Sequence, residues 1–131
     1  MTKLVLIALG GAGGTIARYA VSGWAQRLTG GAVVPVGTLT VNVAGCLLIG
    51  VLGFALSGAV LVREEYRVAL LVGVLGGFTT FSSFGYETLS LLNDGQVGRA
   101  AANVLLNNGA GLVAVWLGYR LAEHFFAGTP G

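Results

Sequence analysis

The stretch GGFTTFSSFGYE, residues 76–87, places two adjacent glycines, four Thr and Ser hydroxyls and three phenylalanines at the end of an apolar segment. No Asp, Glu, Lys or Arg occurs between Val68 and Tyr86. Adjacent glycines weaken a helix, and nearby hydroxyls can satisfy the main-chain groups that a break releases. Irregular backbone at membrane depth is tolerated only inside protein or along a cavity. We therefore predict a transmembrane helix that is broken mid-membrane after Gly76 and Gly77.

The rest of the chain has the composition of a membrane protein. Of 131 residues, 55% are hydrophobic and only 9% are charged, whereas soluble domains carry about 25% charged residues. A helix needs about 20 mostly apolar residues to cross the hydrocarbon core of a bilayer. We predict an all-α membrane protein with four transmembrane helices in a single domain, residues 1–131. The expected spans are residues 4–26, 34–59, 67–92 and 99–122.

Several other functions fit the sequence poorly. The N-terminal apolar run could be a signal peptide, but it continues to Arg18 and three further spans follow. It also contains part of a G-x-G-x-x-G nucleotide motif, but Ile16 replaces the last glycine and no acidic residue follows before Glu64. The single histidine, His124, leaves no Ser/His or Cys/His set for catalysis. The 23 glycines and the lone Cys46 are interpreted as packing residues, and the net charge of +2 gives no indication of nucleic-acid binding.

Polar side chains recur at helical spacing in two of the predicted spans. Thr38 and Asn42 are four residues apart on one face of the second span, and Asn103 and Asn107 are four apart in the fourth. Hydrogen bonds between helices explain such stripes, and so does a polar track through the bundle. Arg18 in the first span also has two interpretations: snorkelling to the interface, or a positive charge that attracts anions to an aqueous mouth.

The stretch after the two glycines offers groups for both a cation and an anion. A helix break frees carbonyl oxygens, which can bind a cation. Phe78, Phe81 and Phe84 recur every three residues and should therefore lie on roughly one face. Ordinary packing accounts for an isolated row of this kind. Because ring edges carry partial positive charge, phenylalanines interleaved with hydroxyls would suit a small, strongly hydrated anion.

Three motifs carry a family resemblance that covers nearly the whole chain. GGAGGTIARY (residues 10–19), GTLTVNVAG (residues 37–45) and GGFTTFSSFGYE resemble the signature motifs of the Fluc (CrcB) family of fluoride channels. Chain length and the four-span layout are similar as well. The resemblance implies a passive, fluoride-selective channel in the cell (inner) membrane, which exports fluoride and prevents its toxic accumulation. It implies no enzymatic activity.

The resemblance also implies a fluoride path built from aromatic, amide and hydroxyl side chains. The implied path residues are Thr38, Asn42, Phe81, Ser82, Ser83 and Phe84, with Arg18 in the aqueous vestibule. Asn103 and Asn107 stand where some relatives supply Tyr and Ser, so the fourth helix contributes donors and acceptors of a different size. Glu87 matches a family acid to which we assign no role. No fixed carboxylate is expected within the four apolar spans.

The implied assembly is an antiparallel, dual-topology homodimer in membrane lipid, with two fluoride paths along the subunit interfaces. A central structural sodium ion would be held by main-chain carbonyls of Gly76 and Thr79 from both copies. Pairing with a second family member as a heterodimer is an open alternative.

The distribution of basic residues favours insertion in both orientations, because the side richer in Lys and Arg becomes cytoplasmic. Four spans place both termini and the 60–67 connection on one side. That side carries four basic residues, Lys3, Arg63, Arg67 and Arg120, and the other carries three, Arg27, Arg99 and, if it snorkels that way, Arg18. A difference of one charge is too small to fix a direction.

Two other functions are alternatives to a fluoride channel. A small multidrug-type, proton-coupled exporter also has four short helices and antiparallel dimers, but it needs an acidic residue midway along its first helix. Residues 4–26 contain none. A non-transporting membrane assembly protein would explain the glycine-rich packing but not the hydroxyl-rich third span.

Overall fold

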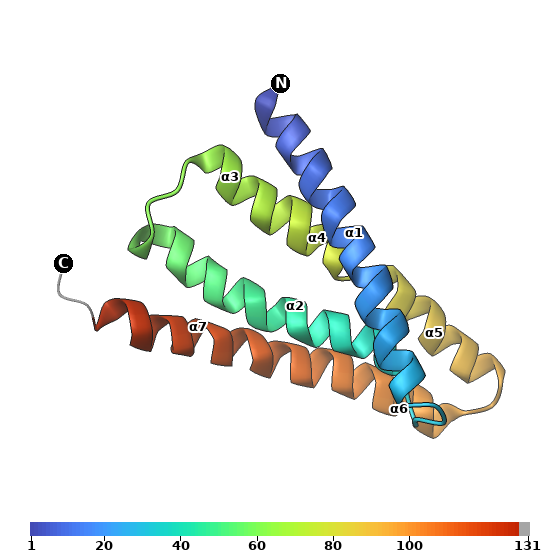
Figure 1. Cartoon of the computed structure of the whole chain (residues 1–131). Coiled ribbons are helices and arrows are strands. Elements are labelled where there is room, and N and C mark those ends of the chain that lie inside the picture. The colour runs from blue at the N-terminus through green and yellow to red at the C-terminus, as the bar shows by residue number, and fades with distance from the viewer. Residues whose placement is uncertain (129–131) are drawn as a thin grey trace.

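The computed structural model describes residues 1–128, and helices joined by short connections make up this part of the chain (Figure 1). Within these residues, four segments are long and apolar enough to cross a membrane: Thr2–Leu28, Val36–Ala59, Glu64–Asn93 and Val97–Ala127. The prediction of an all-helical chain with four membrane-spanning segments is therefore confirmed.

The first segment is a single helix, and each of the others contains a π-helical turn. The elements are α1 (Thr2–Leu28), α2 (Val36–Phe54), η1 (Ala55–Ala59), α3 (Glu64–Val68), η2 (Ala69–Val74), α4 (Leu75–Phe78), α5 (Phe81–Asn93), α6 (Val97–Leu105), η3 (Leu106–Ala110) and α7 (Gly111–Ala127). The turn between α5 and α6 contains Gly95 with φ +73°, a left-handed conformation that glycine adopts without a steric penalty.

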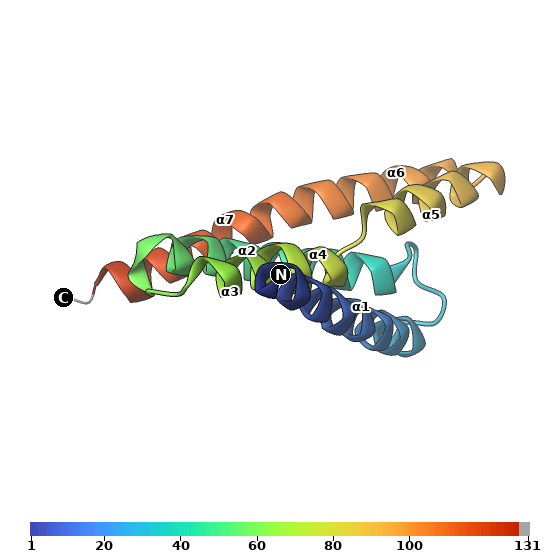
Figure 2. The same ribbon diagram turned by 90° about the horizontal axis from the view of Figure 1, so that it is seen from above.

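The four segments run alternately in opposite directions. The N-terminus, the connection before α3 and the end of α7 lie at one end of the molecule, and the α1–α2 and α5–α6 connections lie at the other (Figure 1). Seen from above, the chain steps sideways between α4 and α5, so that α5 and α6 lie on one side of α2 and α1 lies on the other (Figure 2). The longest helix contact is between α2 and α7, and α1 packs against η2 and α4.

Glycines allow the backbones of α2 and α7 to approach closely. A methyl group added at Gly50 would overlap the carbonyl oxygen of Val115, and one added at Gly118 would overlap that of Leu47. Small residues that permit such contacts are typical of helix packing in membranes, where apolar burial provides little driving force. The interpretation of the glycines as packing residues therefore holds at this contact.

Two extended threonines separate α4 from α5. Thr79 has φ −92° and ψ 158°, and Thr80 has φ −151° and ψ 111°. Thr80 also caps α5, because its Oγ1 accepts a hydrogen bond of 3.2 Å from the N–H of Ser83. The chain thus leaves and re-enters helical conformation within two residues.

The two glycines that prompted the prediction are themselves helical and lie inside α4. Gly77 serves close packing instead, since a methyl group there would lie 2.6 Å from the carbonyl oxygen of Gly11 on α1. Gly76 is exposed, with no atom near the position that a methyl group would take. The non-helical residues are the two threonines that follow.

Candidate functional site

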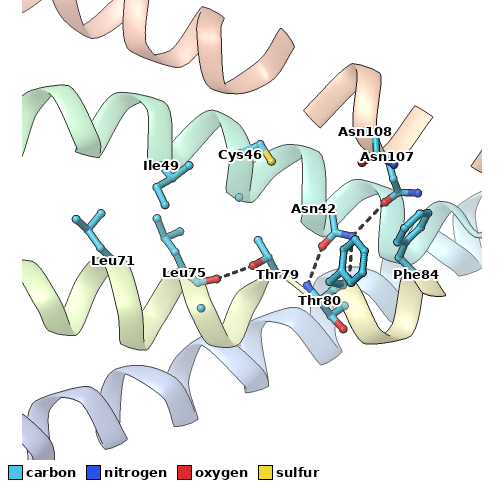
Figure 3. Close-up of a pocket in the computed structure, with 13 residues that line it drawn as sticks. Asn42, Cys46, Ile49, Leu71, Leu75, Thr79, Thr80, Phe84, Asn107 and Asn108 are labelled. Atoms are coloured by element: carbon cyan, nitrogen blue, oxygen red, sulfur yellow. Dashed lines mark hydrogen bonds between the residues drawn. The ribbon is translucent and has the colours of Figure 1, made fainter. Parts of the chain in front are cut away.

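Two neighbouring cavities contain most of the residues predicted for the site. The larger has a volume of about 330 Å³ and lies between α2, η2, α4, α5 and η3 (Figure 3). We call it the asparagine cavity. Six predicted residues line it: Asn42, Gly76, Thr79, Phe81, Phe84 and Asn107.

The smaller cavity has a volume of about 280 Å³ and lies between α1, α2 and α5. We call it the arginine cavity, because Arg18 lines it together with the predicted path residues Thr38 and Ser83. Thr80 lines both cavities. The arginine and the hydroxyl groups of three helices therefore meet in one hollow, and a single threonine stands between it and the asparagine cavity.

Glu87 also lines the arginine cavity. Its Oε1 accepts a hydrogen bond of 2.6 Å from the hydroxyl of Thr38, whereas its buried Oε2 has no hydrogen-bond partner among residues 1–128. The expectation that the spans contain no carboxylate is therefore wrong, because Glu87 lies within the segment Glu64–Asn93. The signal was present in the sequence, since residue 87 falls inside the predicted third span.

Asn42 ties α2 to the extended residues between α4 and α5 (Figure 3). Its Oδ1 accepts a hydrogen bond of 2.8 Å from the N–H of Thr80. Its Nδ2 donates to the carbonyl oxygen of Thr80 and to Oδ1 of Asn107, each at 3.1 Å. One amide side chain thus satisfies both main-chain groups of Thr80, and the predicted polar stripes do form hydrogen bonds between helices.

Carbonyl oxygens around the interruption lose their helical donors, and those of Gly76 and Thr79 are two of them. In a continuous α-helix the N–H of Thr80 would donate to the carbonyl of Gly76, and the N–H of Ser83 to that of Thr79. These N–H groups donate instead to Asn42 Oδ1 and Thr80 Oγ1. Carbonyl oxygens released in this way are ligands that a hard cation accepts. No group of three His, Cys, Asp or Glu side chains suited to a metal ion occurs in residues 1–128, so a cation here would depend on main-chain oxygens.

The rings of Phe81 and Phe84 meet at an angle. Their centroids are 5.3 Å apart and their planes are inclined at 60°. Phe84 is 7% exposed and Phe81 is 78% exposed. Phe78 lines neither cavity, and the three rings do not share one helical face, because Thr79 and Thr80 leave the helix between the first ring and the other two.

Two predicted path residues lie outside the cavities. Ser82 is exposed, with its hydroxyl 3.4 Å from that of Thr80. Asn103 has no exposed surface, and its Nδ2 donates a hydrogen bond of 3.0 Å to Oγ1 of Thr88. Thr88 was not singled out from the sequence. A signal for it is the short 94–96 connection, which makes α5 and α6 antiparallel neighbours.

The chain is similar to known proteins over most of its length. A family model described as CrcB-like protein, Camphor Resistance (CrcB) matches residues 5–119. A relative from Methylobacillus flagellatus is 46% identical over 94% of this chain and 96% of its own length. One from Geobacter metallireducens is 47% identical over 95% and 99%, and one from Thermus thermophilus is 48% identical over 91% and 92%. Each of the three is named fluoride-specific ion channel FluC.

Proposed function

The chain belongs to the CrcB family, and from this premise we propose that it is a fluoride-specific ion channel. The observation that carries the proposal is the similarity to relatives of that name over 91% to 95% of the chain. Fluoride enters cells as its neutral acid, dissociates at the higher internal pH and is trapped. A passive channel in the cell (inner) membrane lets the anion leave down its gradient and prevents toxic accumulation.

The chemistry of the two cavities suits this function. Removing water from so small an anion costs a great deal of free energy, so the path must replace water with several weak donors. The edges of the Phe81 and Phe84 rings carry partial positive charge. Thr38, Ser83 and Arg18 line the arginine cavity. We propose that fluoride passes these groups in sequence, with Ser82, Asn42 and Asn107 as further members of the polar track.

We propose that the channel is an antiparallel homodimer whose α4–α5 interruption lies at mid-membrane. Phe81 supports a second copy, because a ring that is 78% exposed beside polar groups offers its edge to an ion only if another surface encloses it. Gly76, which is exposed and has open space around it, lines the same cavity as Phe81. Lipid would cover the remaining apolar surface.

A structural sodium ion fits the interruption. The residues that would hold it are Gly76 and Thr79, through carbonyl oxygens whose helical donors bond elsewhere. Two such oxygens from each of two copies would enclose a cation between the subunits. When bound, the ion supplies a fixed positive charge beside the anion path. Asn42 and Thr80 contribute by withholding the two N–H groups from those carbonyls.

The test is ion release from liposomes that contain the purified protein and are loaded with both fluoride and chloride. We expect rapid fluoride release, recorded with a fluoride electrode, and retention of chloride. Equal release of both anions, or no release of either, would exclude a fluoride channel. In a second set of liposomes, loaded with an organic cation, release driven by a proton gradient would favour the exporter. Absence of transport in both sets would favour an assembly protein.

A further inference from the structure

Five hydrogen bonds between α2, η3, α6 and α5 all run in one direction. They link the N–H of Thr80 to Asn42 Oδ1 (2.8 Å), Asn42 Nδ2 to Asn107 Oδ1 (3.1 Å), Asn107 Nδ2 to Asn103 Oδ1 (2.9 Å), Asn103 Nδ2 to Thr88 Oγ1 (3.0 Å), and Thr88 Oγ1 to the carbonyl of Phe84 (2.8 Å). We call these linked side chains the amide chain. Its first two links, from Thr80 to Asn42 and from Asn42 to Asn107, are drawn in Figure 3.

Main-chain groups determine which way each amide points. A main-chain N–H can only donate and a carbonyl oxygen can only accept. Asn42 must therefore turn Oδ1 to the N–H of Thr80 and Nδ2 to its carbonyl oxygen. Asn107 Nδ2 also donates to the main-chain carbonyl of Asn103, at 3.0 Å. At the far end, the Thr88 hydroxyl gives its hydrogen to the Phe84 carbonyl and can only accept from Asn103.

Asn103 is the most enclosed member of the amide chain. Its exposed fraction is 0%, and both ends of its amide are engaged with Asn107 and Thr88. It therefore has no surface left to offer an ion. Instead, Asn103 Oδ1 accepts a hydrogen bond from Asn107 Nδ2. Asn107 Oδ1 is then turned so that it accepts a hydrogen bond from Asn42 Nδ2.

We propose that Asn103 and Thr88 are positioning residues that act through Asn107 and Asn42 to maintain the interruption between α4 and α5. Asn42 alone could rotate and release the N–H of Thr80 to the carbonyl of Gly76, which would extend α4 and occupy an oxygen of the cation site. With Asn107 anchored, that rotation breaks the hydrogen bond between Asn42 and Asn107 in addition to the two bonds between Asn42 and Thr80. This role rests on the proposed function, because the fluoride path and the cation site both depend on the shape of the interruption. In this proposal Asn103 positions other residues and does not itself contact fluoride.

The first test compares Thr88→Val with Thr88→Ser. Valine keeps the shape of threonine and loses the hydroxyl, whereas serine keeps the hydroxyl and loses a methyl group. We expect Thr88→Val to lower the selectivity for fluoride over chloride by about five- to tenfold, the factor expected from one lost neutral hydrogen bond. Thr88→Ser should stay near wild type. The melting temperature of both variants is measured alongside.

A second measurement of the Thr88 variants does not depend on conduction. NMR in detergent micelles follows hydrogen exchange of the Asn42 and Asn107 side-chain amides. We expect faster exchange in Thr88→Val, by a similar factor, and wild-type exchange in Thr88→Ser. Equal exchange in the two variants, or a lower melting temperature with unchanged selectivity and exchange, would overturn the proposal. If the wild-type protein conducts no fluoride while the amides still respond to Thr88→Val, the proposed function fails and the amide chain stands.

The second test is the pH profile of Asn103→Asp. A protonated aspartic acid can donate to Thr88 Oγ1 and accept from Asn107, as the amide does. The ionised form has no donor to give, and its burial without a compensating charge is costly. Fluoride flux of Asn103→Asp should therefore be near wild type at mildly acidic pH and be lost as the pH rises through the pKa of the new carboxyl group. Protein-free liposomes give the leak of the neutral acid at each pH, and a flat profile parallel to that of wild type would overturn the proposal.

Discussion

At the scale of single residues, the cavities gather side chains that are far apart in the sequence. Asn42 binds Thr80 and Asn107, which are 38 and 65 residues away along the chain. Helical spacing predicts that Thr38 and Asn42 share a face, and both indeed contact α5 or the residues before it. Spacing carries no information on which residue of another helix lies opposite, and this is why Thr88 and the partner of Glu87 were missed.

Replacing Phe84 with Ile tests whether its ring edge contributes to conduction. Isoleucine preserves bulk and hydrophobicity and removes the partial positive charge of the ring edge. We expect Phe84→Ile to assemble normally, judged by size-exclusion chromatography in detergent, and to pass fluoride much more slowly than wild type.

Phe84→Ala is the less informative change, because truncating a buried phenylalanine commonly costs about 3–5 kcal/mol of stability. Its loss of flux could follow from misfolding. Wild-type flux from a well-assembled Phe84→Ile would return this ring to an ordinary packing role.

At the scale of helices, the interruption depends on another helix as well as on its own residues. The sequence predicts an interruption at Gly76–Thr79, and the residues that leave the helix are Thr79 and Thr80. Asn42 on α2 provides the alternative hydrogen-bond partners that make the extended conformation of Thr80 stable. The π-helical turns η1, η2 and η3 had no sequence signal that we could use, because one extra residue in a turn leaves the apolar pattern nearly unchanged.

Removing sodium should affect variants at the interruption differently. Asn42→Leu frees the N–H of Thr80 to donate to the carbonyl of Gly76, as in a continuous helix. Thr79→Val removes only a hydroxyl that donates 3.0 Å to the carbonyl of Leu75. We expect wild type and Thr79→Val to lose stability when sodium is replaced by a bulky organic cation, and Asn42→Leu to respond weakly. Melting temperatures in the two salts measure this, and a Thr79→Val protein that ignores sodium would argue against carbonyl ligands.

Alanine scanning of two glycines on α2 tests the close contact with α7. Gly50→Ala should destabilise the protein by about 1–3 kcal/mol, the usual cost of overpacking, because the new methyl group meets the Val115 carbonyl. Gly53→Ala is the matched control three residues later, with no atom within 4 Å of the new methyl group. It should be neutral, or stabilising by up to about 1 kcal/mol through helix propensity. Unfolding titrations in mixed micelles compare them, and equal losses of stability would contradict the contact.

At the scale of the whole molecule, the sequence was sufficient for the number, type and approximate extent of the spans. Long charge-free runs allow few other solutions in a bilayer. The three motifs were also sufficient to identify the family. In the structure they lie on α1, on α2 and in the α4–α5 region, which surround the cavities. The arrangement of one span against another could not be predicted, because it depends on contacts such as that between Gly50 and Val115 and on hydrogen bonds between helices.

Insertion in both orientations is the expected behaviour of the whole chain. The two ends of the molecule carry four and three basic residues, by the assignment Lys3, Arg63, Arg67 and Arg120 against Arg18, Arg27 and Arg99. So small a bias does not select one direction. A tag at the C-terminus should be labelled from each side of the membrane in about half of the molecules, the even split that an absent charge bias predicts. Accessibility from a single side would exclude the antiparallel homodimer and favour a parallel assembly or a partner of opposite orientation.

The uniform direction of the amide chain has an electrical consequence. Aligned amides add their dipoles, so each copy carries a small polarity that points from Thr80 towards Thr88. In a single copy, or in two parallel copies, such a built-in field would favour ions that move one way. A two-fold axis in the membrane plane sets the dipole components along the membrane normal antiparallel, so these components cancel between the two copies. The proposed pair would then pass equal currents at equal positive and negative voltages, without rectification, although each of its halves is polarised.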